Sequence, residues 1–585
     1  MTSRDLLTIH SPIAADYRRP ASTAEGAPLV AGADVRASAI GDGAGSIPER
    51  APPATPNGLE LPAHTEIELK LVTDPAHLRA LLNAPVILAH ARNKGRVRHL
   101  TTVYCDTPEG ALEQAGIAFR IRQCGNRFII GVKRACPDGS SPLQRDEWEA
   151  PAEGDAPDPS PVLPLVPADV QALLTSGPLQ PVFTTRLRRH TLRLSLAGGV
   201  VEVAFDQGLV QAKNRATPIS EIEIELKAGS PAAVYDVASH LAELAPLRPS
   251  VRSKAERGFA LAFDRPLPGH REARAELSGE FSLDDALLAI LRSIVAHLLA
   301  NQAAAEDGRD PEGVHQMRVG LRRLRAVLTL IRRFAPSAVL DSLRADARWL
   351  ATALGDARNW DVFLLDLLPV VAHGCSAIEG FGALEAAVRT HRASVYEKTH
   401  EALSAPRAGR FHILLGAWIE QRGWRVGAAP EALAMLTAPA LAFAGPVLAR
   451  RQRKVLKRGR HFRHLAPHER HRVRIAVKRL RYSTDFFLSL GGASKSSRRY
   501  LHHLSELQEL LGSYNDMAAT PDRAAELAGY ALSPSAQTAL GAVIGWQAHG
   551  LVRIEPDLRA AWHAFRHAAT PWSSWPSPGP DRTVS

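Results

Sequence analysis

Residues 219–227 read Ile-Ser-Glu-Ile-Glu-Ile-Glu-Leu-Lys, and residues 66–70 read Glu-Ile-Glu-Leu-Lys. In both stretches a charged side chain alternates with an apolar one. A period of two predicts a β-strand that has one apolar face and one charged face. Carboxylates in a row on one strand face repel one another unless cations lie between them. Both stretches therefore predict strands whose charged face needs a compensating partner.

The same alternation recurs through residues 64–265. Basic residues take alternate positions in 119–122 and 185–188, and acidic residues do so in 145–149 and 202–206. This pattern makes sense if the sheet closes, so that the charges point into a water-filled lumen and the apolar face packs outward against helices. Divalent cations with oxygen ligands would then balance the acids, and Arg and Lys would bind phosphate oxygens.

Beyond residue 281 the pattern changes, because apolar residues recur at intervals of three and four, which predicts helices. This half contains an internal repeat: His315–Arg325 reads HQMRVGLRRLR, and His471–Arg481 reads HRVRIAVKRLR, 156 residues later. Each copy is followed by a Leu-Gly pair near an acid. A duplicated helical unit is the simplest explanation.

The repeated motif places basic residues on one helix face, because the spacings are three, four and three. Solvated helix faces usually carry both signs, since opposite charges four residues apart stabilise a helix and like charges destabilise it. Neither copy of this face contains an acid, and the histidines lack neighbouring ligands for a metal. The predicted polyanion-binding residues are His315, Arg318, Arg322, Arg325, His471, Arg474, Lys478 and Arg481.

The overall composition agrees with a polyanionic partner. The 585-residue chain has a net charge of +11, and residues 281–570 contain 39 Lys and Arg against 26 Asp and Glu. A basic half of this kind favours nucleic acid, anionic lipid or a phosphate polymer. No apolar run of 18 residues or signal sequence is present, so we expect no membrane span. Four cysteines without metal-ligand spacing predict a reducing cytoplasm.

Composition also predicts the division of the chain. An Ala-, Gly-, Pro- and Ser-rich leader without periodicity covers residues 1–60 and is expected to be disordered. The strand-rich domain follows at 61–265, a linker at 266–278, the helical domain at 279–570 and a disordered tail at 571–585.

The strand-rich domain resembles CYTH domains, the triphosphate tunnel metalloenzymes, over about 200 residues. The matching motifs, in order, are Glu66–Lys70, Tyr104–Asp106, Ala118–Arg122, Gly131–Lys133, Arg145–Glu149, Thr185–Arg188, Glu202–Asp206, Ile219–Lys227 and Ser253–Gly258. The resemblance implies an eight-stranded antiparallel β-tunnel with flanking helices, a linear triphosphate substrate and a requirement for Mg²⁺ or Mn²⁺. Gly131 stands where the family usually has Thr.

The resemblance also implies the role of each matching residue. Glu66, Glu68 and Lys70 would be catalytic. The metal ligands would be Glu66, Glu68, Glu223 and Glu225, with Asp206 and Glu221 as further candidates. The phosphate-binding residues would be Lys70, Arg120, Arg122, Lys133, Arg186, Arg188 and Lys254.

The second half resembles the CHAD domain, a helical domain of two four-helix repeats. The matching residues are Val314–Arg318 with Arg322–Arg325 and Leu354–Asp361, and in the second copy His471–Arg474 with Lys478–Arg481 and Leu511–Asp516. The first copy has Asn359 where an Asp is expected. The resemblance implies binding of inorganic polyphosphate, which should depend steeply on salt.

Several hypotheses for function remain open at this point. The leading one is a metal-dependent inorganic triphosphatase that hydrolyses tripolyphosphate and carries a polyphosphate-binding helical domain. The alternative is a polyphosphate- or granule-binding protein with little turnover, and a third is an adenylate cyclase that uses the same tunnel on ATP. Specific nucleic-acid binding is not expected, because few aromatic residues interleave with the basic clusters. We expect a cytoplasmic location, with association to polyphosphate granules.

Overall fold

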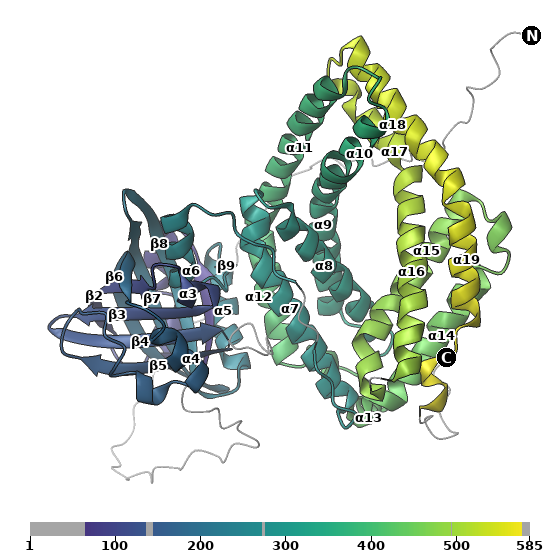
Figure 1. The fold of residues 1–585 in the computed structure, drawn as a ribbon. Coiled ribbons are helices and arrows are strands. Elements are labelled where there is room, and N and C mark those ends of the chain that lie inside the picture. Colours follow the sequence, from purple (N-terminus) through teal and green to yellow (C-terminus); the bar gives the residue numbers. More distant parts are fainter. Residues whose placement is uncertain (1–64, 136–143, 272–274, 493, 576–585) are drawn as a thin grey trace, which may run out of the picture. The chain divides into compact units, whose positions relative to one another are not determined.

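A computed structural model describes residues 65–135, 144–271, 275–492 and 494–575. The predicted leader at 1–60 and Cys136 lie outside these residues. Figure 1 shows a strand-rich part followed by a part built of helices. The fold class expected from the sequence is therefore confirmed.

Eight antiparallel strands form a closed ring in the first part (Figure 1). Their order is β5-β4-β3-β2-β6-β7-β8-β1, and β1 pairs with β5 to close the sheet. A two-residue strand, β9 (Arg248–Pro249), adds to β1. The strands are β1 (Thr65–Val72), β2 (Arg96–Asp106), β3 (Ile117–Cys124), β4 (Arg127–Ala135), β5 (Gln144–Ala152), β6 (Gln180–Leu196), β7 (Gly199–Ala212) and β8 (Arg215–Gly229).

The apolar face of the ring packs outward against helices, as the alternation predicts. Leu69 and Ile224, on neighbouring strands, are buried in one cluster with Val237 and Leu241 of α5 (Ala232–Leu244). Because successive side chains on a strand point to opposite faces, the charged residues between them must point inward. Short helices complete the outer layer: α1 (Pro75–Leu81), α2 (Pro85–His90), α3 (Ala111–Gln114) and α4 (Ala168–Leu174).

Helix α6 (Lys254–Phe263) packs against the inside of β6 and β7. It begins with a capping box, in which the Ser253 hydroxyl accepts from the Glu256 amide and the Glu256 carboxylate accepts from the Ser253 amide. Phe259 of α6 is buried against Phe183, with ring centroids 5.1 Å apart. The cap fixes the start of the helix and thereby the position of Lys254.

The second part repeats a set of four long helices. The first set is α7 (Leu283–Asp307), α8 (Pro311–Ile331), α9 (Ala338–Asp361) and α11 (Phe381–Ser404), and the second is α14 (Ala440–Arg458), α15 (Pro467–Phe487), α16 (Lys495–Ala518) and α18 (Pro534–Arg553). The remaining helices are α10 (Leu368–Gly374), α12 (Pro406–Glu420), α13 (Pro430–Thr437), α17 (Thr520–Glu526) and α19 (Glu555–His567). Helices α8 and α15, which carry the repeated motif, contact each other.

The expected tail differs from the structure at its start. Residues Pro571–Ser574 form a short 3₁₀-helix, and Trp572 packs against Tyr500 with ring centroids 4.9 Å apart. The apolar surface of this tryptophan outweighs the turn-forming Pro and Ser residues around it. Within the described residues, no helix is long and apolar enough to cross a membrane.

Candidate functional site

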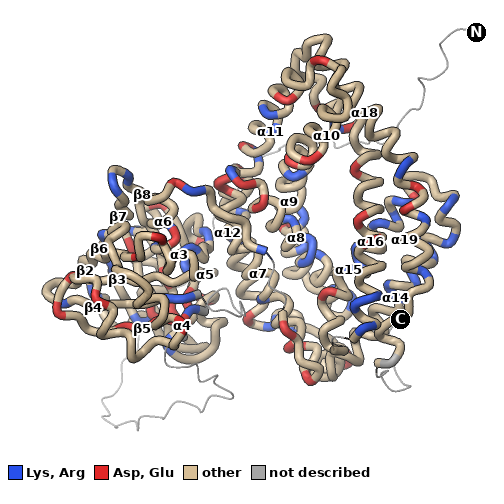
Figure 2. The backbone as a smooth tube through the Cα atoms, viewed as in Figure 1, with Lys and Arg blue, Asp and Glu red and all other residues tan. Residues whose placement is uncertain are grey.

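The strands of the closed sheet line most of an open cavity, whose volume, including the part outside the ring, is about 1560 Å³. Figure 2 shows acidic and basic residues close together on these strands. The charged residues that line the cavity are Glu66, Glu68, Lys70, Arg96, Arg98, Glu113, Arg120, Arg122, Lys133, Arg134, Arg145, Glu147, Glu149, Arg189, Arg193, Glu202, Glu223, Glu225, Arg252, Lys254, Glu256 and Arg265. The cavity therefore combines carboxylates for cations with guanidinium and ammonium groups for anions.

One group of charges lies on β1, β3, β4 and β5. Arg120 donates to Glu147 and, at 3.1 Å, to Glu149, while the Lys133 ammonium lies 2.9 Å from Glu66 and 2.7 Å from Glu147. Burial raises the pKa of Glu66 to about 8, although Lys133 opposes this. Burial also acts to raise the pKa of Glu147, but Arg120 and Lys133 hold it below its ordinary value. Glu147 is thus the carboxylate on which these two cations converge.

Gly131 leaves space for this network. A Cβ atom at residue 131 would lie 2.9 Å from Nε of Arg120 and 3.6 Å from a carboxylate oxygen of Glu149. A larger side chain would therefore push the guanidinium aside. The absence of the Thr found in the family is consistent with this position of Arg120.

A second group surrounds the Lys254 ammonium. Its nitrogen lies 2.8 Å from Asp206, 2.6 Å from Glu221 and 2.7 Å from Glu223. Burial acts to lower the pKa of Lys254, but the three carboxylates raise it above its ordinary value. Their oxygens are close enough together to hold a metal ion. The Lys254 ammonium lies among them in this structure, and the metal-ligand role expected for Glu223, with Asp206 and Glu221 as further candidates, stays a prediction.

Two of the expected phosphate-binding residues do not line the cavity. Arg186 and Arg188 are exposed on the outer face of β6. Arg189, which was not expected, points inward, where it donates to Asp206 at 2.6 Å and also to Glu223. The tunnel position expected for Arg186 and Arg188 is therefore wrong.

The error has a physical cause in the inner face of β6. Thr185, Leu187 and Arg189 line the cavity, and Leu187 packs there with Leu100 and Phe183. At this end the lumen is apolar. The apolar residue of the alternating pair therefore faces inward, and the charged residue faces solvent.

A third group of acids has fewer cations. Glu68 and Glu225 are paired across β1 and β8, and Glu202 is paired with Glu225 across β7 and β8. Lys227 lies 2.5 Å from Glu225, and Lys70 lies 3.5 Å from Glu68. Burial raises the pKa of Glu225, and Glu68 and Glu202 add to this effect. Carboxylate oxygens on adjacent strands are the ligands that a hard divalent cation takes, although the oxygens of these three acids lie farther apart than those of Asp206, Glu221 and Glu223.

Several residues of these groups have no role predicted from the sequence. Glu147, Glu149 and Glu202 lie in the alternating motifs, so the alternation itself indicated that they share the inner face. Arg189 and Arg257 had no such signal. Arg257 donates to Glu221 from α6, and nothing in the strand pattern could have located it.

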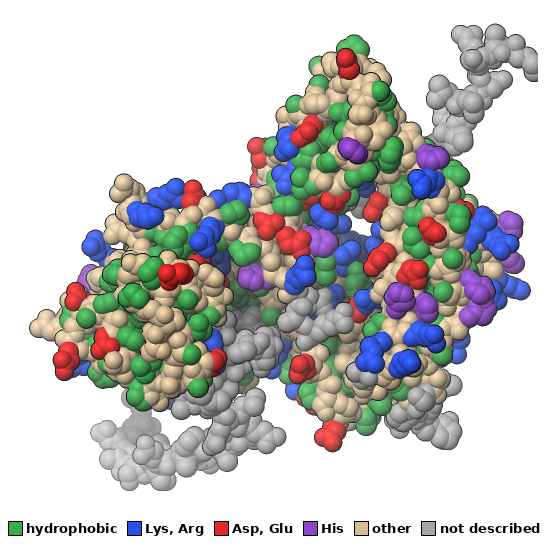
Figure 3. All heavy atoms as spheres, in the orientation of Figure 1, with side chains coloured by type: hydrophobic (Ala, Val, Ile, Leu, Met, Phe, Trp, Pro, Cys, Tyr) green, Lys and Arg blue, Asp and Glu red, His purple; other side chains and the backbone are tan. Residues whose placement is uncertain are grey.

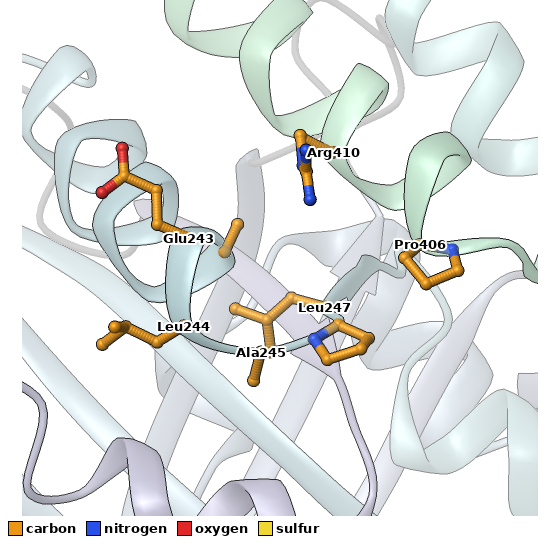
Figure 4. A pocket seen from close by; sticks show the side chains of 8 residues that line it. Glu243, Leu244, Ala245, Leu247, Pro406 and Arg410 are labelled. Carbon is orange, nitrogen blue, oxygen red and sulfur yellow. The ribbon is translucent and has the colours of Figure 1, made fainter. Parts of the chain in front are cut away.

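A smaller hollow of about 150 Å³ lies elsewhere on the molecule (Figure 4). It is lined by residues 242–247, which end α5 and follow it, and by Pro406 and Arg410 of α12. Figure 4 shows the side chains of Glu243 and Arg410 in it. Its charged lining residues are a single acid and a single base, which is too few for a catalytic or binding site.

In the helical part, basic residues from both repeats lie close together. We call His315, Arg318 and Arg322 of α8, Arg358 of α9, and Arg474 and Lys478 of α15 the central basic cluster. Figure 2 shows the basic residues along α8 and α15, and Figure 3 shows Lys and Arg on the surface of this part. The members lie close enough to affect one another. The charge of Arg322 lowers the pKa of His315, Arg318, Arg474 and Lys478.

The central basic cluster is poorly compensated. Burial, then Arg474 and Arg322, lower the pKa of Lys478 to about 7. Burial, then Arg322, lower the pKa of Arg318 to about 10. The carboxylate of Asp516 lies 3.8 Å from the Arg474 guanidinium and acts to raise these pKa values. Closely spaced cations with depressed pKa values form a site that an anion would stabilise.

Other expected binding residues have partners within the protein. Arg481 donates to Asp485 on its own helix. His471 shares a 2.6 Å hydrogen bond with the side-chain oxygen of Asn515. Arg325 lies at the surface. The partial burial of its guanidinium, and then the neighbouring arginines, lower its pKa. The structure thus places Arg318, Arg322, Arg474 and Lys478 together with His315, and it gives Arg481 a different contact.

Comparison with known families agrees with this division. Residues 64–259 match the CYTH domain, and residues 289–525 match the CHAD domain. The tunnel and the duplicated helical part therefore correspond to two described domain types. The chain is a fusion of a CYTH domain with a CHAD domain.

Individual relatives match one part or the other. An inorganic triphosphatase from Haemophilus influenzae is 32% identical over 200 residues, which are 34% of this chain and 54% of that protein, so the match spans about half of the relative. The CHAD domain from Ricinus communis is 33% identical, covers 52% of this chain and 98% of that one, and has a TM-score of 0.44. An adenylyl cyclase candidate from Hippeastrum, described as having a dominant triphosphatase activity, is 18% identical, covers 33% of this chain and 95% of that one, and has a TM-score of 0.26.

The depressed pKa of Lys478 predicts a pH-dependent cost to stability. Below pH 7 the folded protein must hold a charged Lys478 among arginines, and this cost decreases as the pH rises from 7 toward the ordinary lysine value of 10.5. We expect Lys478→Met to raise the midpoint of thermal unfolding below pH 7, and the gain to shrink toward pH 10. Exposed Lys398→Met is the control and should have little effect. A Lys478→Met midpoint below that of the wild type at pH 6 would contradict the prediction.

Proposed function

We propose that the tunnel hydrolyses inorganic triphosphate with a divalent cation, Mg²⁺ or Mn²⁺, and that the helical domain binds inorganic polyphosphate. The observation that carries the first part is the open cavity of about 1560 Å³, in which acids and bases from neighbouring strands line the part inside the ring. Tripolyphosphate resembles the end of a polyphosphate chain, so one chemistry would serve both parts. The triphosphatase that matches the tunnel domain supports this substrate.

The basic residues of the cavity would bind and orient the substrate. Arg120, Arg122 and Lys133 line one side and Arg189 another, so a linear triphosphate between them would contact cations along its length. Arginine can bind two phosphate oxygens at once, which fixes orientation. Holding the terminal phosphoryl group in line for attack by water would account for most of the catalysis.

The acidic residues would hold the cation. Glu68, Glu225 and Glu202 form the acid group with the fewest compensating charges, and Glu66 lies on the same strand as Glu68. A divalent cation at this position would neutralise charge on the phosphoryl oxygens during the transfer. Lys70 would remain between the acids, where its ammonium can contact a phosphate. Lys254, together with Arg189 and Arg257, would compensate the charges of Asp206, Glu221 and Glu223.

We expect hydrolysis to need both the metal and its ligands. Glu66→Gln and Glu225→Gln should each lower the turnover of tripolyphosphate by about 100-fold or more, because each removes a carboxylate oxygen that would hold the cation. Exposed Glu153→Gln is the matched control and should behave as the wild type. Phosphate release is measured with Mg²⁺, with Mn²⁺ and in EDTA, on tripolyphosphate, ATP, thiamine triphosphate and long polyphosphate.

The outcomes separate the competing hypotheses. Full activity in EDTA, or in both Gln variants, would contradict the assignment. Absence of turnover on every substrate, with binding intact, would favour the non-catalytic binding protein. Conversion of ATP to a cyclic product would favour the cyclase.

The inner and outer faces of β6 should differ in their effect on kinetics. Arg189→Ala should raise the substrate concentration needed for half-maximal rate, because a charge-assisted hydrogen bond contributes about 1.5–3 kcal/mol. Arg186→Ala and Arg188→Ala, which remove side chains from the outer face, are the matched controls and should leave the kinetics unchanged. The opposite pattern would return the tunnel role to Arg186 and Arg188.

Polyphosphate binding by the helical domain should depend on the central basic cluster. Arg322→Glu with Lys478→Glu should abolish binding of long-chain polyphosphate, and wild-type binding should weaken steeply with salt, because several phosphates are neutralised together. Titrations in EDTA, with double-stranded DNA as competitor, measure this. Unchanged binding by the double variant would make the cluster structural, and equal competition by DNA would make the domain a general polyanion binder.

A further inference from the structure

A second group of cations lies outside the central basic cluster. Residues 451, 454 and 458 of α14 are spaced three and four apart, so Arg451, Lys454 and Arg458 share one helix face. Arg333, just after the end of α8, and Arg479 of α15 lie near this face. We call these five residues the outer basic cluster. Figure 2 shows the basic residues along α14.

Contacts between the helices hold the outer basic cluster together. The Arg451 guanidinium, 9% exposed, donates at 2.6 Å to the carbonyl of Arg479 and also to the Ser483 hydroxyl. Arg458 donates to the carbonyl of Arg472 at 2.9 Å. Burial, then Arg458, Arg479, Arg333 and Arg451, lower the pKa of Lys454. The five cations are therefore close enough to repel one another.

Among the described residues, no carboxylate forms an ion pair with any member of this cluster. Arg451 and Arg458 instead use neutral oxygens as acceptors. Cations beside the cluster behave differently: Arg332 pairs with Asp341 at 2.6 Å, and Arg470 pairs with Glu555. Like charges held together without acids raise the energy of the free protein, and an external anion would lower it.

We propose that the outer basic cluster is a second polyphosphate-binding site, which long chains reach from the central basic cluster. This inference rests on the proposed polyphosphate binding by the helical domain. Arg322 and Arg333 are eleven residues apart on α8 or directly after it, which is roughly 16 Å along the axis and nearly the same face at 100° per residue. Arg325 lies between them on the same side of the helix.

The chemistry of the outer cluster favours a phosphate polymer over other polyanions. The aromatic residues next to its members, Phe334 and Tyr482, are partly buried in the hydrophobic core, which leaves less ring surface for the base stacking that single-stranded nucleic acid would need. The cluster itself contains no large apolar side chain to enter a lipid surface. A flexible chain with a negative charge on every phosphate matches several cations on a short stretch of surface. Binding at two sites would strengthen long-chain binding, because the second contact is intramolecular.

The test compares chain lengths on the full-length protein. We expect Lys454→Glu with Arg479→Glu to weaken binding of long-chain polyphosphate by about tenfold or more, because the second contact is lost. Binding of short-chain polyphosphate should change little, because the central cluster is intact. The slope of log affinity against log salt should also become smaller for the long chain. Affinities are measured by calorimetry in EDTA.

Matched variants make the result specific. Lys398→Glu with Arg553→Glu changes the net charge equally at exposed positions on α11 and α18, and it should bind both chain lengths like the wild type. Lys454→Gln with Arg479→Gln removes the two charges without reversing them. Thermal unfolding of each variant shows whether the fold is intact. Long-chain affinity and salt slope equal to those of the charge-matched control would overturn the inference.

Further outcomes distinguish this inference from the proposed function. If wild type binds no polyphosphate of either length, the proposed function itself fails. If Arg322→Glu with Lys478→Glu removes binding while Lys454→Glu with Arg479→Glu leaves long-chain affinity unchanged, only the second site fails. Loss of binding to DNA or to phosphatidylserine vesicles in the outer variant, with polyphosphate binding unchanged, would also overturn it.

Discussion

The tunnel depends on the mutual compensation of charges that the closed sheet forces together. A row of carboxylates on β8 and another on β1 would repel each other on an open sheet. Closure through the short β1–β5 pairing brings the cations of β3 and β4 opposite these acids, with Lys133 2.9 Å from Glu66. The apolar face can then be covered by α5. The charges inside and the hydrophobic packing outside thus favour the same closed geometry.

The sequence predicted the strands and most of the tunnel residues because alternation reports directly which side chains share a face. The prediction failed where the charged residues of a strand do not face the lumen. Beside β6 the lumen is apolar, so Leu187 faces inward and Arg188 faces outward. The prediction placed the charged residues of this strand in the lumen and therefore chose the wrong face. Arg257 on α6 could not be placed, because its position depends on how a helix packs into the ring.

The helical domain was predictable for a different reason. The duplicated motif fixed two equivalent faces, and the 156-residue repeat implied that equivalent faces recur. Sequence spacing could not distinguish Arg474 from Arg481, although both lie on the expected stripe. The difference arises from Asp485, four residues after Arg481, which provides a partner on the same helix. Spacing identifies a face, but the neighbouring acids decide which cations on it have partners in the protein.

Lys254 has a consequence for how the tunnel responds to its medium. A dissolved cation leaves its ligands when it is diluted or chelated, whereas an ammonium attached to the backbone has no such equilibrium. Because α6 is anchored by its cap, this ammonium stays within 2.8 Å of all three acids. The tunnel therefore contains a permanent counter-ion beside Asp206, Glu221 and Glu223. Under the proposed function, the adjoining Glu68 and Glu225 would hold an exchangeable cation, and Lys70, 3.5 Å from both Glu68 and Glu223, lies between the two groups. Chelation would then remove the dissolved cation while the Lys254 ammonium stays in place, so the lumen keeps a fixed positive charge whatever the metal content of the medium.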